Sequence, residues 1–182
     1  MKAFESLKDR HRRFIAEQKM FFVGSAPLSP DGHVNVSPKG LDSFAVLDAN
    51  RVAYIDLGGS GIETHSHVQE NGRLCIMFCA FAGKPLILRL YGQGQAHGYG
   101  TAEFELLRPR FPGIDVPVRG VIELAITRVQ DSCGWAVPYY EYQGDRSRLL
   151  EHNAERSQQT FIERRLETNA ESLDGLPGLR RP

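Results

Sequence analysis

A glycine-rich turn near the middle of the sequence has the composition of an anion-binding loop. The run Gly58-Gly59-Ser60-Gly61 follows a stretch rich in β-formers, residues 51–57, and contains too many glycines for a regular element. A helix that begins after such a turn presents unpaired backbone N–H groups, and its dipole adds positive potential. The turn could therefore hold a phosphate group, although a tight structural turn has the same composition.

A short helix is expected directly after the glycines. Ser60 and Glu63 have the spacing of a capping box, in which the serine is the N-cap and the glutamate lies three residues on. Asn71-Gly72 supplies a stop signal at the other end. The sequence therefore predicts a helix of about two turns that opens on the glycine turn.

Two cations occupy positions at which a bound anion could compensate their charge. Arg89 lies within the apolar run 85–95, where a charged side chain must face water, a partner or an anion. Ser37 and Lys39 lie at the end of the predicted strand 33–37. Pro38, between them, is expected to end or interrupt the hydrogen-bond ladder there. Strand ends are common locations for ligand contacts, so these three residues are candidate phosphate ligands.

The elements that must position these residues are mostly strands. Turn signals at short spacing separate six or more β-rich segments, and glycines at near-alternate positions in 91–100 indicate a curved or bulged strand. The predicted strands are 20–26, 33–37, 51–57, 73–81, 85–95 and 120–130, with connections at 41–50 and 108–117. Helices are predicted over 4–19, 101–107 and 145–171, and the tail beyond is expected to dock as an extended segment.

This pattern predicts a mainly β fold, an antiparallel Greek-key barrel with peripheral helices. We expect one domain over 1–182, with the N-terminal helix at about 4–19 and a C-terminal helical segment and tail at about 145–182. The aromatic-rich stretch 131–142 carries the single tryptophan, and such clusters usually indicate packing, a dimer surface or a cover for a flat cofactor.

Other chemistries receive less support. His65 and His67 would point about 200° apart on a helix, so they do not face one metal, and we expect them at the solvent or at a flavin edge. Cys75 and Cys79 have apolar neighbours that favour buried thiols, and no base is placed beside Cys133 by the sequence. We find no nucleophile elbow, Walker loop or dinucleotide fingerprint.

The overall composition argues against several partners. Formal net charge over the 182 residues is zero, so no global field favours nucleic acid or an anionic membrane. No run approaches the roughly 20 apolar residues of a transmembrane helix, and the basic N-terminus lacks the apolar segment of a secretory signal. Three cysteines without framework spacing favour reduced thiols and a cytoplasmic location.

Several segments, in order and over most of the chain, resemble the pyridoxamine 5'-phosphate oxidase-like, FMN-binding split-barrel family. The resemblance is closest to a branch of uncharacterised oxidase-related proteins. The segments are residues 33–40 (HVNVSPKG), 56–64 (DLGGSGIET), 70–73 (ENGR), the Arg89 strand, 132–134 (SCG) and 172–178 (SLDGLPG).

The resemblance implies a split barrel that forms a homodimer with two FMN sites at the interface and acts on a small-molecule substrate. Lys39 and Arg89 would hold the phosphate, the turn would supply backbone donors, and residues 132–135 would cover the ring. No catalytic or metal-binding residue is identified. The implied cofactor residues are Ser37, Lys39, Gly40, Asp56, Ser60, Gly61, Glu63, Thr64, Arg89, Ser132, Cys133, Gly134 and Trp135.

The sequence departs from the true oxidases of this family at two places. Glu63-Thr64 stands where those enzymes usually have an Arg-Lys pair, and the basic C-terminal substrate motif is missing. We therefore expect an FMN-dependent oxidoreductase with an activity other than pyridoxamine 5'-phosphate oxidation. The alternatives are a cofactor-binding or sensing module for flavin, deazaflavin or haem, and a barrel without cofactor that acts as an interaction protein.

Overall fold

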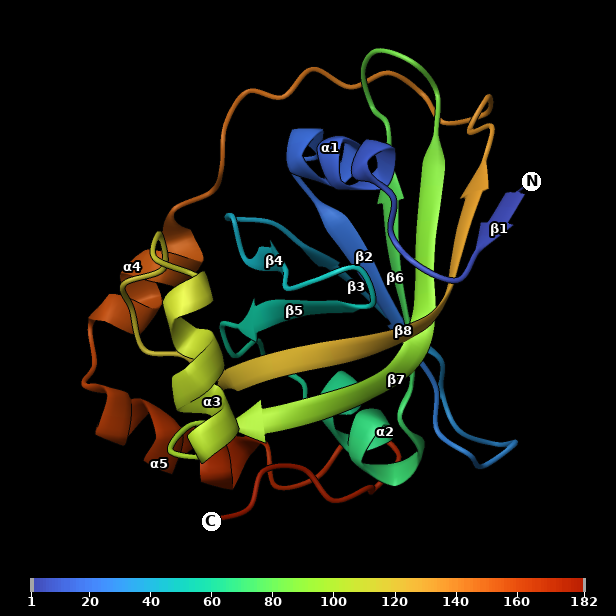
Figure 1. Cartoon of the computed structure of the whole chain (residues 1–182). Coiled ribbons are helices and arrows are strands. Elements are labelled where there is room, and N and C mark those ends of the chain that lie inside the picture. Colours follow the sequence, from blue (N-terminus) through green and yellow to red (C-terminus); the bar gives the residue numbers. More distant parts are fainter. Residues whose placement is uncertain (1, 182) are drawn as a thin grey trace.

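The computed structural model describes residues 2–181 and is built around one antiparallel β-sheet (Figure 1). In these residues the sheet has eight strands in the order β3-β2-β6-β7-β8-β5-β4, and β1 pairs with β8 beside this path. The strands are β1 (Lys2–Phe4), β2 (Phe21–Ser25), β3 (Asn35–Lys39), β4 (Phe44–Val46), β5 (Arg51–Asp56), β6 (Arg73–Cys79), β7 (Ile87–Gly98) and β8 (Gly120–Ser132).

The sheet curls into a half-barrel because its longest strands bend. The register of β7 against β8 shifts between Tyr91 and Gly92, and a side chain at Gly92 would collide with the backbone carbonyl of Ala125. The curl brings the two ends of the sheet together. Phe21 on β2 and Phe44 on β4 lie with ring centroids 5.0 Å apart, and Phe78 on β6 packs on both.

Helices cover the barrel at two ends and one side (Figure 1). Helix α1 (Asp9–Glu17) lies over one end, while α2 (Glu63–Asn71) packs on β2, β6 and β7. Helices α3 (Ala102–Leu107), α4 (Arg148–Ala154) and α5 (Gln158–Thr168) gather beside the ends of β5, β7 and β8, and a short 3-10 turn, Arg108–Arg110, follows α3. A second apolar cluster, around Ile55, Phe111 and Val121, fills the space beneath them.

The predicted mainly β class with peripheral helices is confirmed, and several element predictions need correction. Pro38 lies inside β3 opposite Phe22, because β3 is an edge strand that pairs only with β2 and loses no ladder bond through the missing N–H. The predicted connection 41–50 contains β4. The first helix begins only at Asp9, and the C-terminal helix divides at Ser157, whose hydroxyl accepts the Thr160 N–H and caps α5.

Candidate functional site

The glycine loop, defined here as Gly58–Gly61, joins β5 to α2 and has one buried and one exposed end. Gly58 is buried at φ +74°, and a Cβ there would lie 2.6 Å from the ring of Phe161, so only glycine fits. Gly59 and Ser60 are exposed, and no atom lies within 4 Å of the position a Cβ would take at Gly59. A ligand can therefore approach the loop backbone closely.

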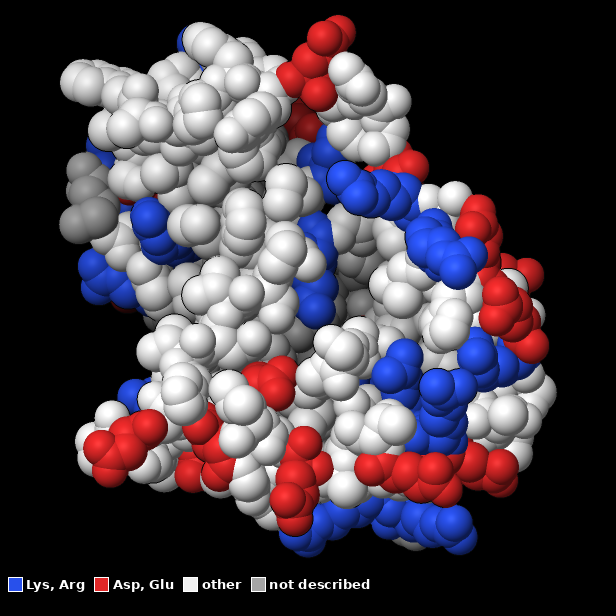
Figure 2. All heavy atoms as spheres, turned by 180° about the vertical axis from the view of Figure 1, so that it is seen from behind, with Lys and Arg blue, Asp and Glu red and all other residues white. Residues whose placement is uncertain are grey.

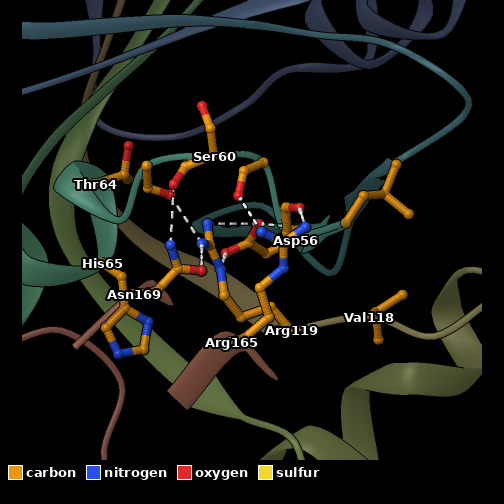
Figure 3. Close-up of polar contacts among 12 residues, drawn as sticks. Asp56, Ser60, Thr64, His65, Val118, Arg119, Arg165 and Asn169 are labelled. Atoms are coloured by element: carbon orange, nitrogen blue, oxygen red, sulfur yellow. Dashed lines mark hydrogen bonds and ion pairs between the residues drawn. The ribbon is translucent and has the colours of Figure 1, made fainter. Parts of the chain in front are cut away.

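The carbonyl groups of the loop are held by side chains from distant parts of the chain (Figure 3). Five consecutive carbonyls, from Leu57 to Gly61, each accept a side-chain hydrogen bond, and none of these donors is on a neighbouring residue. The bonds are Asn153 Nδ2 to Leu57 O at 2.8 Å, Arg165 to Gly58 O at 2.6 Å and to Gly59 O at 3.0 Å, Asn169 Nδ2 to Ser60 O at 3.0 Å, and Arg119 Nη1 to Gly61 O at 2.8 Å. These contacts fix the orientation of the loop backbone.

The N–H groups of the loop and of the first turn of α2, unlike the carbonyl groups, lack hydrogen-bond partners among the described residues. Within residues 2–181 no hydrogen-bond acceptor occurs for the N–H groups of residues 59–65, and the first bonded amide in α2 is Ser66 N–H to Ile62 O at 3.0 Å. The N-cap is Ile62, which has no capping side chain. The loop therefore combines fixed carbonyls with a run of free donors at a helix N-terminus.

The predicted capping box is wrong. Helix α2 begins at Glu63, so Ser60 lies two residues before the N-cap and cannot cap the helix. The Glu63 carboxylate accepts the Leu173 N–H at 3.3 Å, which ties it to the C-terminal tail rather than to the Ser60 N–H. The hydroxyls of Ser60 and Thr64 point to the same side of the loop, away from Arg119 and Asn169 (Figure 3).

A buried ion pair lies beneath the loop. Arg119, which precedes β8, donates from Nε to Asp56 Oδ2 at 2.8 Å and from Nη2 to Asp56 Oδ1 at 3.1 Å, and both side chains are 7% exposed. Arg119 also donates to Asn169 Oδ1 at 2.9 Å. Burial raises the pKa of Asp56, but the charge and hydrogen bonds of Arg119 and the charge of Lys39 outweigh it and hold this pKa at about 2.

Lys39, Ser37 and Asn35 lie together on one face of β3, toward α2. Their partners in β2 are Phe21, Val23 and Ser25, and Asn35 Nδ2 donates to Thr64 Oγ1 at 2.9 Å. Burial lowers the pKa of Lys39, while the charge of Asp56 partly opposes this shift. Within the described part of the chain the Lys39 ammonium makes no hydrogen bond or ion pair, so it is a half-buried cation without a direct partner.

The remaining predicted residues lie elsewhere. Arg89 is opposite Met77 in β6 and Gln130 in β8, so it shares the outward face of the sheet with Met77, whereas Lys39 is on the face of Val23 and Ile76. Arg89 Nη1 donates to Ser132 Oγ at 3.3 Å, which links it to the segment 132–135. Cys133 is exposed and Trp135 is 83% exposed. Within one chain, Lys39 and Arg89 therefore cannot hold the same phosphate.

The expected solvent-facing histidines are buried. His65 is 6% exposed and His67 is fully buried, because α2 packs against the sheet on one side and against the C-terminal tail on the other. His67 Nδ1 lies 3.0 Å from Ser25 Oγ, and His65 Nε2 lies 2.9 Å from Gln69 Nε2. Burial, aided by the charge of Arg119 and opposed by that of Asp56, lowers the pKa of His65 to about 4.

This pKa makes fold stability depend on pH. The unfolded chain binds a proton on His65 near pH 6.5 and the folded chain only near pH 4, so stability must fall as the pH drops through this window. From pH 8 to pH 5 we expect His65 alone to reduce the free energy of unfolding by about 2 kcal/mol. Urea denaturation at both pH values would show a smaller loss in His65→Gln. His152 is half-exposed, so the variant His152→Gln should lose as much unfolding free energy between pH 8 and pH 5 as the wild type does. Equal losses in the wild type and both variants would contradict the assignment of this pH dependence to His65.

Sequence reasoning missed the residues that fix the loop. Arg119, Asn153, Arg165 and Asn169 lie 58 to 109 residues from the carbonyls they bind. The one available signal was the apolar surroundings of Arg119, between Val118 and Val121. Among the described residues no group of three or more His, Cys, Asp or Glu side chains could hold a metal ion, and no helix is long and apolar enough to cross a membrane.

An antiparallel sheet curled into a half-barrel, with a few peripheral helices, defines the class of split-barrel proteins. A family model described as "Pyridoxamine 5'-phosphate oxidase" matches residues 7–133. The chain belongs to this family. A curated relative from Aspergillus flavus, the pyridoxamine 5'-phosphate oxidase family protein ustO, is 40% identical over 195 aligned residues, which cover 97% of this chain and 77% of the relative.

Solved structures show the same fold at low sequence identity. The HupZ protein of Group A Streptococcus superposes with a TM-score of 0.53 at 17% identity over 74% of this chain and 99% of its own. A Lactobacillus delbrueckii protein provisionally described as a pyridoxamine 5'-phosphate oxidase gives a TM-score of 0.51 at 18% identity, over 71% of this chain and 99% of its own. The match confirms the predicted split barrel.

Proposed function

We propose that this protein binds FMN through the glycine loop and acts as an FMN-dependent oxidoreductase. The observation that carries the proposal is the run of free N–H groups in residues 59–65, which begins at the exposed Gly59 and Ser60 and leads into the N-terminus of α2, where no side chain caps the helix. A phosphate monoester carries close to two negative charges and is stabilised by such donors and by the helix dipole. Family membership supports FMN as the phosphate-bearing group.

The charges around the loop fit this ligand. Arg119 is neutralised by Asp56, so it does not supply free positive charge to the phosphate. Lys39 lies close enough to Asp56 for their charges to interact and has no direct partner among the described residues, so its ammonium is available to a phosphate. The Glu63 carboxylate accepts the Leu173 N–H and also lies against Gly61, with Oε2 at the position that a Cβ would take there, so its charge opposes a phosphate at this end of the loop.

The flavin, when bound, supplies the redox chemistry, and the protein supplies binding and orientation. In one chain Lys39, beside the glycine loop, and Arg89, which binds Ser132, lie on opposite faces of the sheet. A flavin that contacts both groups would therefore lie between two copies of the chain, with Arg89 and Trp135 contributed by the partner copy. The large exposed side chains Val36, Trp135 and Tyr139 support a homodimer of this kind.

A comparison of FMN with riboflavin tests the role assigned to the loop. The two flavins differ only in the phosphate, so a protein that holds this phosphate should bind FMN at least about tenfold more tightly. Flavin fluorescence quenching on titration into the purified protein measures both affinities, and a visible spectrum of the protein as purified shows flavin that is already bound. Equal affinities would contradict the phosphate site, and no binding of either flavin would contradict the proposed function as a whole.

The substrate is proposed to be a small organic molecule that meets the flavin between the two copies. Glu63-Thr64 in place of the basic pair and the missing basic C-terminal motif favour a substrate other than pyridoxamine 5'-phosphate. A turnover assay with this compound and oxygen should therefore give no product above background, and rapid formation of pyridoxal 5'-phosphate would overturn this part of the proposal.

A further inference from the structure

A second group of cations lines a cavity on the C-terminal helices, beside the exposed part of the glycine loop at Ser60. The cavity has a volume of about 230 Å³ and lies between α4, α5 and Ser60. Basic side chains gather over α5, at the lower right of the molecule in Figure 2. The lining contains no carboxylate and consists of Ser60, His152, Arg156, Phe161, Arg164, Arg165 and Thr168.

The three arginines have few anionic contacts of their own. Arg165 lies with its guanidinium 5.1 Å from the Phe161 ring and donates to the carbonyls of Gly58 and Gly59. Arg156 donates to the His152 carbonyl at 2.7 Å, and its nearest carboxylate oxygen, on Glu155, is 3.8 Å away. The guanidinium of the exposed Arg164 makes no hydrogen bond or ion pair with any described residue.

The local field is positive as a result. The pKa of Arg165 is lowered by burial and then by the neighbouring guanidinium groups of Arg119, Arg164 and Arg156, although Asp56 acts in the opposite direction. Arginines kept close together without carboxylates repel one another, and a bound anion would relieve this repulsion. The pair of Arg156 with Glu155 contributes little compensation, because its atoms are 3.8 Å apart and the Glu155 carboxylate is exposed to solvent.

We propose that this cavity binds a phosphate group, free or at the end of a small metabolite, at a site distinct from the flavin phosphate. Planar guanidinium groups match phosphate oxygens in bidentate geometry. The volume is below the roughly 300–1,000 Å³ of sites for drug-sized ligands, which suits a small anion. Arg165 contacts the carbonyl side of the glycine loop, whereas the flavin phosphate is assigned to the N–H groups, so the two anions need not compete.

Isothermal titration calorimetry with inorganic phosphate and with glycerol phosphate, at constant ionic strength, tests the site. Both Arg156→Gln and Arg164→Gln should weaken binding about ten- to a hundredfold, since each removes charge-assisted hydrogen bonds. Arg148→Gln is the matched control, because Arg148 is on α4, is 83% exposed and does not line the cavity. Circular dichroism melting shows whether the variants are folded. Tighter binding of glycerol phosphate would identify a phosphorylated metabolite as ligand, and tighter binding of inorganic phosphate would identify the free anion.

The same titration in the presence of saturating FMN separates this site from the flavin site. If the sites are distinct, phosphate affinity should change less than about twofold. Loss of the phosphate binding that depends on Arg156 and Arg164 when FMN is saturating would overturn the proposal, since the cavity would then be part of the flavin site. Absence of heat with either phosphate at millimolar concentration, or an equal effect of Arg148→Gln, would also overturn it. A protein that binds phosphate but not FMN would refute only the proposed flavin function.

Discussion

Replacing Arg119 by methionine should lower the free energy of unfolding at pH 7 by about 3–5 kcal/mol, because the change leaves the buried Asp56 carboxylate without its partner. The same side chain also binds Gly61 O and Asn169 Oδ1, so its loss removes two further contacts of the glycine loop. Urea or guanidinium denaturation measures the effect. A loss below about 1 kcal/mol would contradict the view that this pair is a major contributor to loop stability.

The double variant Asp56→Leu/Arg119→Met is the informative companion to this experiment. Replacement of both charges by apolar groups removes the uncompensated carboxylate, so it should recover much of the stability lost in Arg119→Met. In the wild-type protein the pKa of Asp56 is lowered from 3.8 to about 2, so the contribution of the pair is present above pH 4 and is lost as the pH falls toward 2. The double variant should lack this acid-sensitive component.

Replacing Lys39 by methionine should weaken FMN binding about ten- to a hundredfold while the affinity for riboflavin stays the same. The ammonium is half-buried and without a direct partner, so a phosphate nearby would gain a strong interaction that riboflavin cannot make. The change should also leave the fold intact, because Lys39 makes no ion pair in the described structure that the substitution could break. It also removes a charge that is partly shielded from water. Fluorescence titration and thermal melting measure the two effects.

Lys84→Met provides the matched control for this variant. Lys84 is exposed in the turn between β6 and β7, and its replacement removes the same charge from a segment that contains neither the glycine loop nor β3. If Lys39→Met and Lys84→Met reduce FMN affinity equally, the effect comes from net charge and the role assigned to Lys39 is wrong. Equal losses of FMN and riboflavin affinity in Lys39→Met would place the lysine at the ring rather than at the phosphate.

The elements that the sequence predicted correctly are those whose signals are local. The β6–β7 hairpin follows from two apolar runs around a glycine turn, and Gly72 ends α2 with φ +70° as the Asn-Gly signal indicates. Helix α3 lies within the predicted range 101–107, and the bulge occurs at Gly92 as the glycine spacing suggests. Each of these features is decided by residues within a few positions of one another.

The features that could not be predicted depend on packing between distant segments. The burial of His65 and His67 follows from a C-terminal tail about a hundred residues away that covers α2, and Glu63 turns to the same tail. Strand β4 is short and lacks an alternating pattern, so only its pairing with β5 reveals it. Lys39 and Arg89 were assigned to one phosphate because sequence order does not show which face of the curled sheet each residue occupies.

The carbonyl contacts of the glycine loop also set an order of events during synthesis. Arg165 and Asn169 leave the ribosome after all the strands of the sheet, and they supply the donors for Gly58, Gly59 and Ser60. The barrel strands are complete at Ser132, so the sheet can form first while the loop still lacks its final orientation. A nascent chain stalled before α5 would therefore have a folded sheet but a loop without its final orientation, and the ability to capture a phosphate there would arise only after Arg165 and Asn169 have been synthesised.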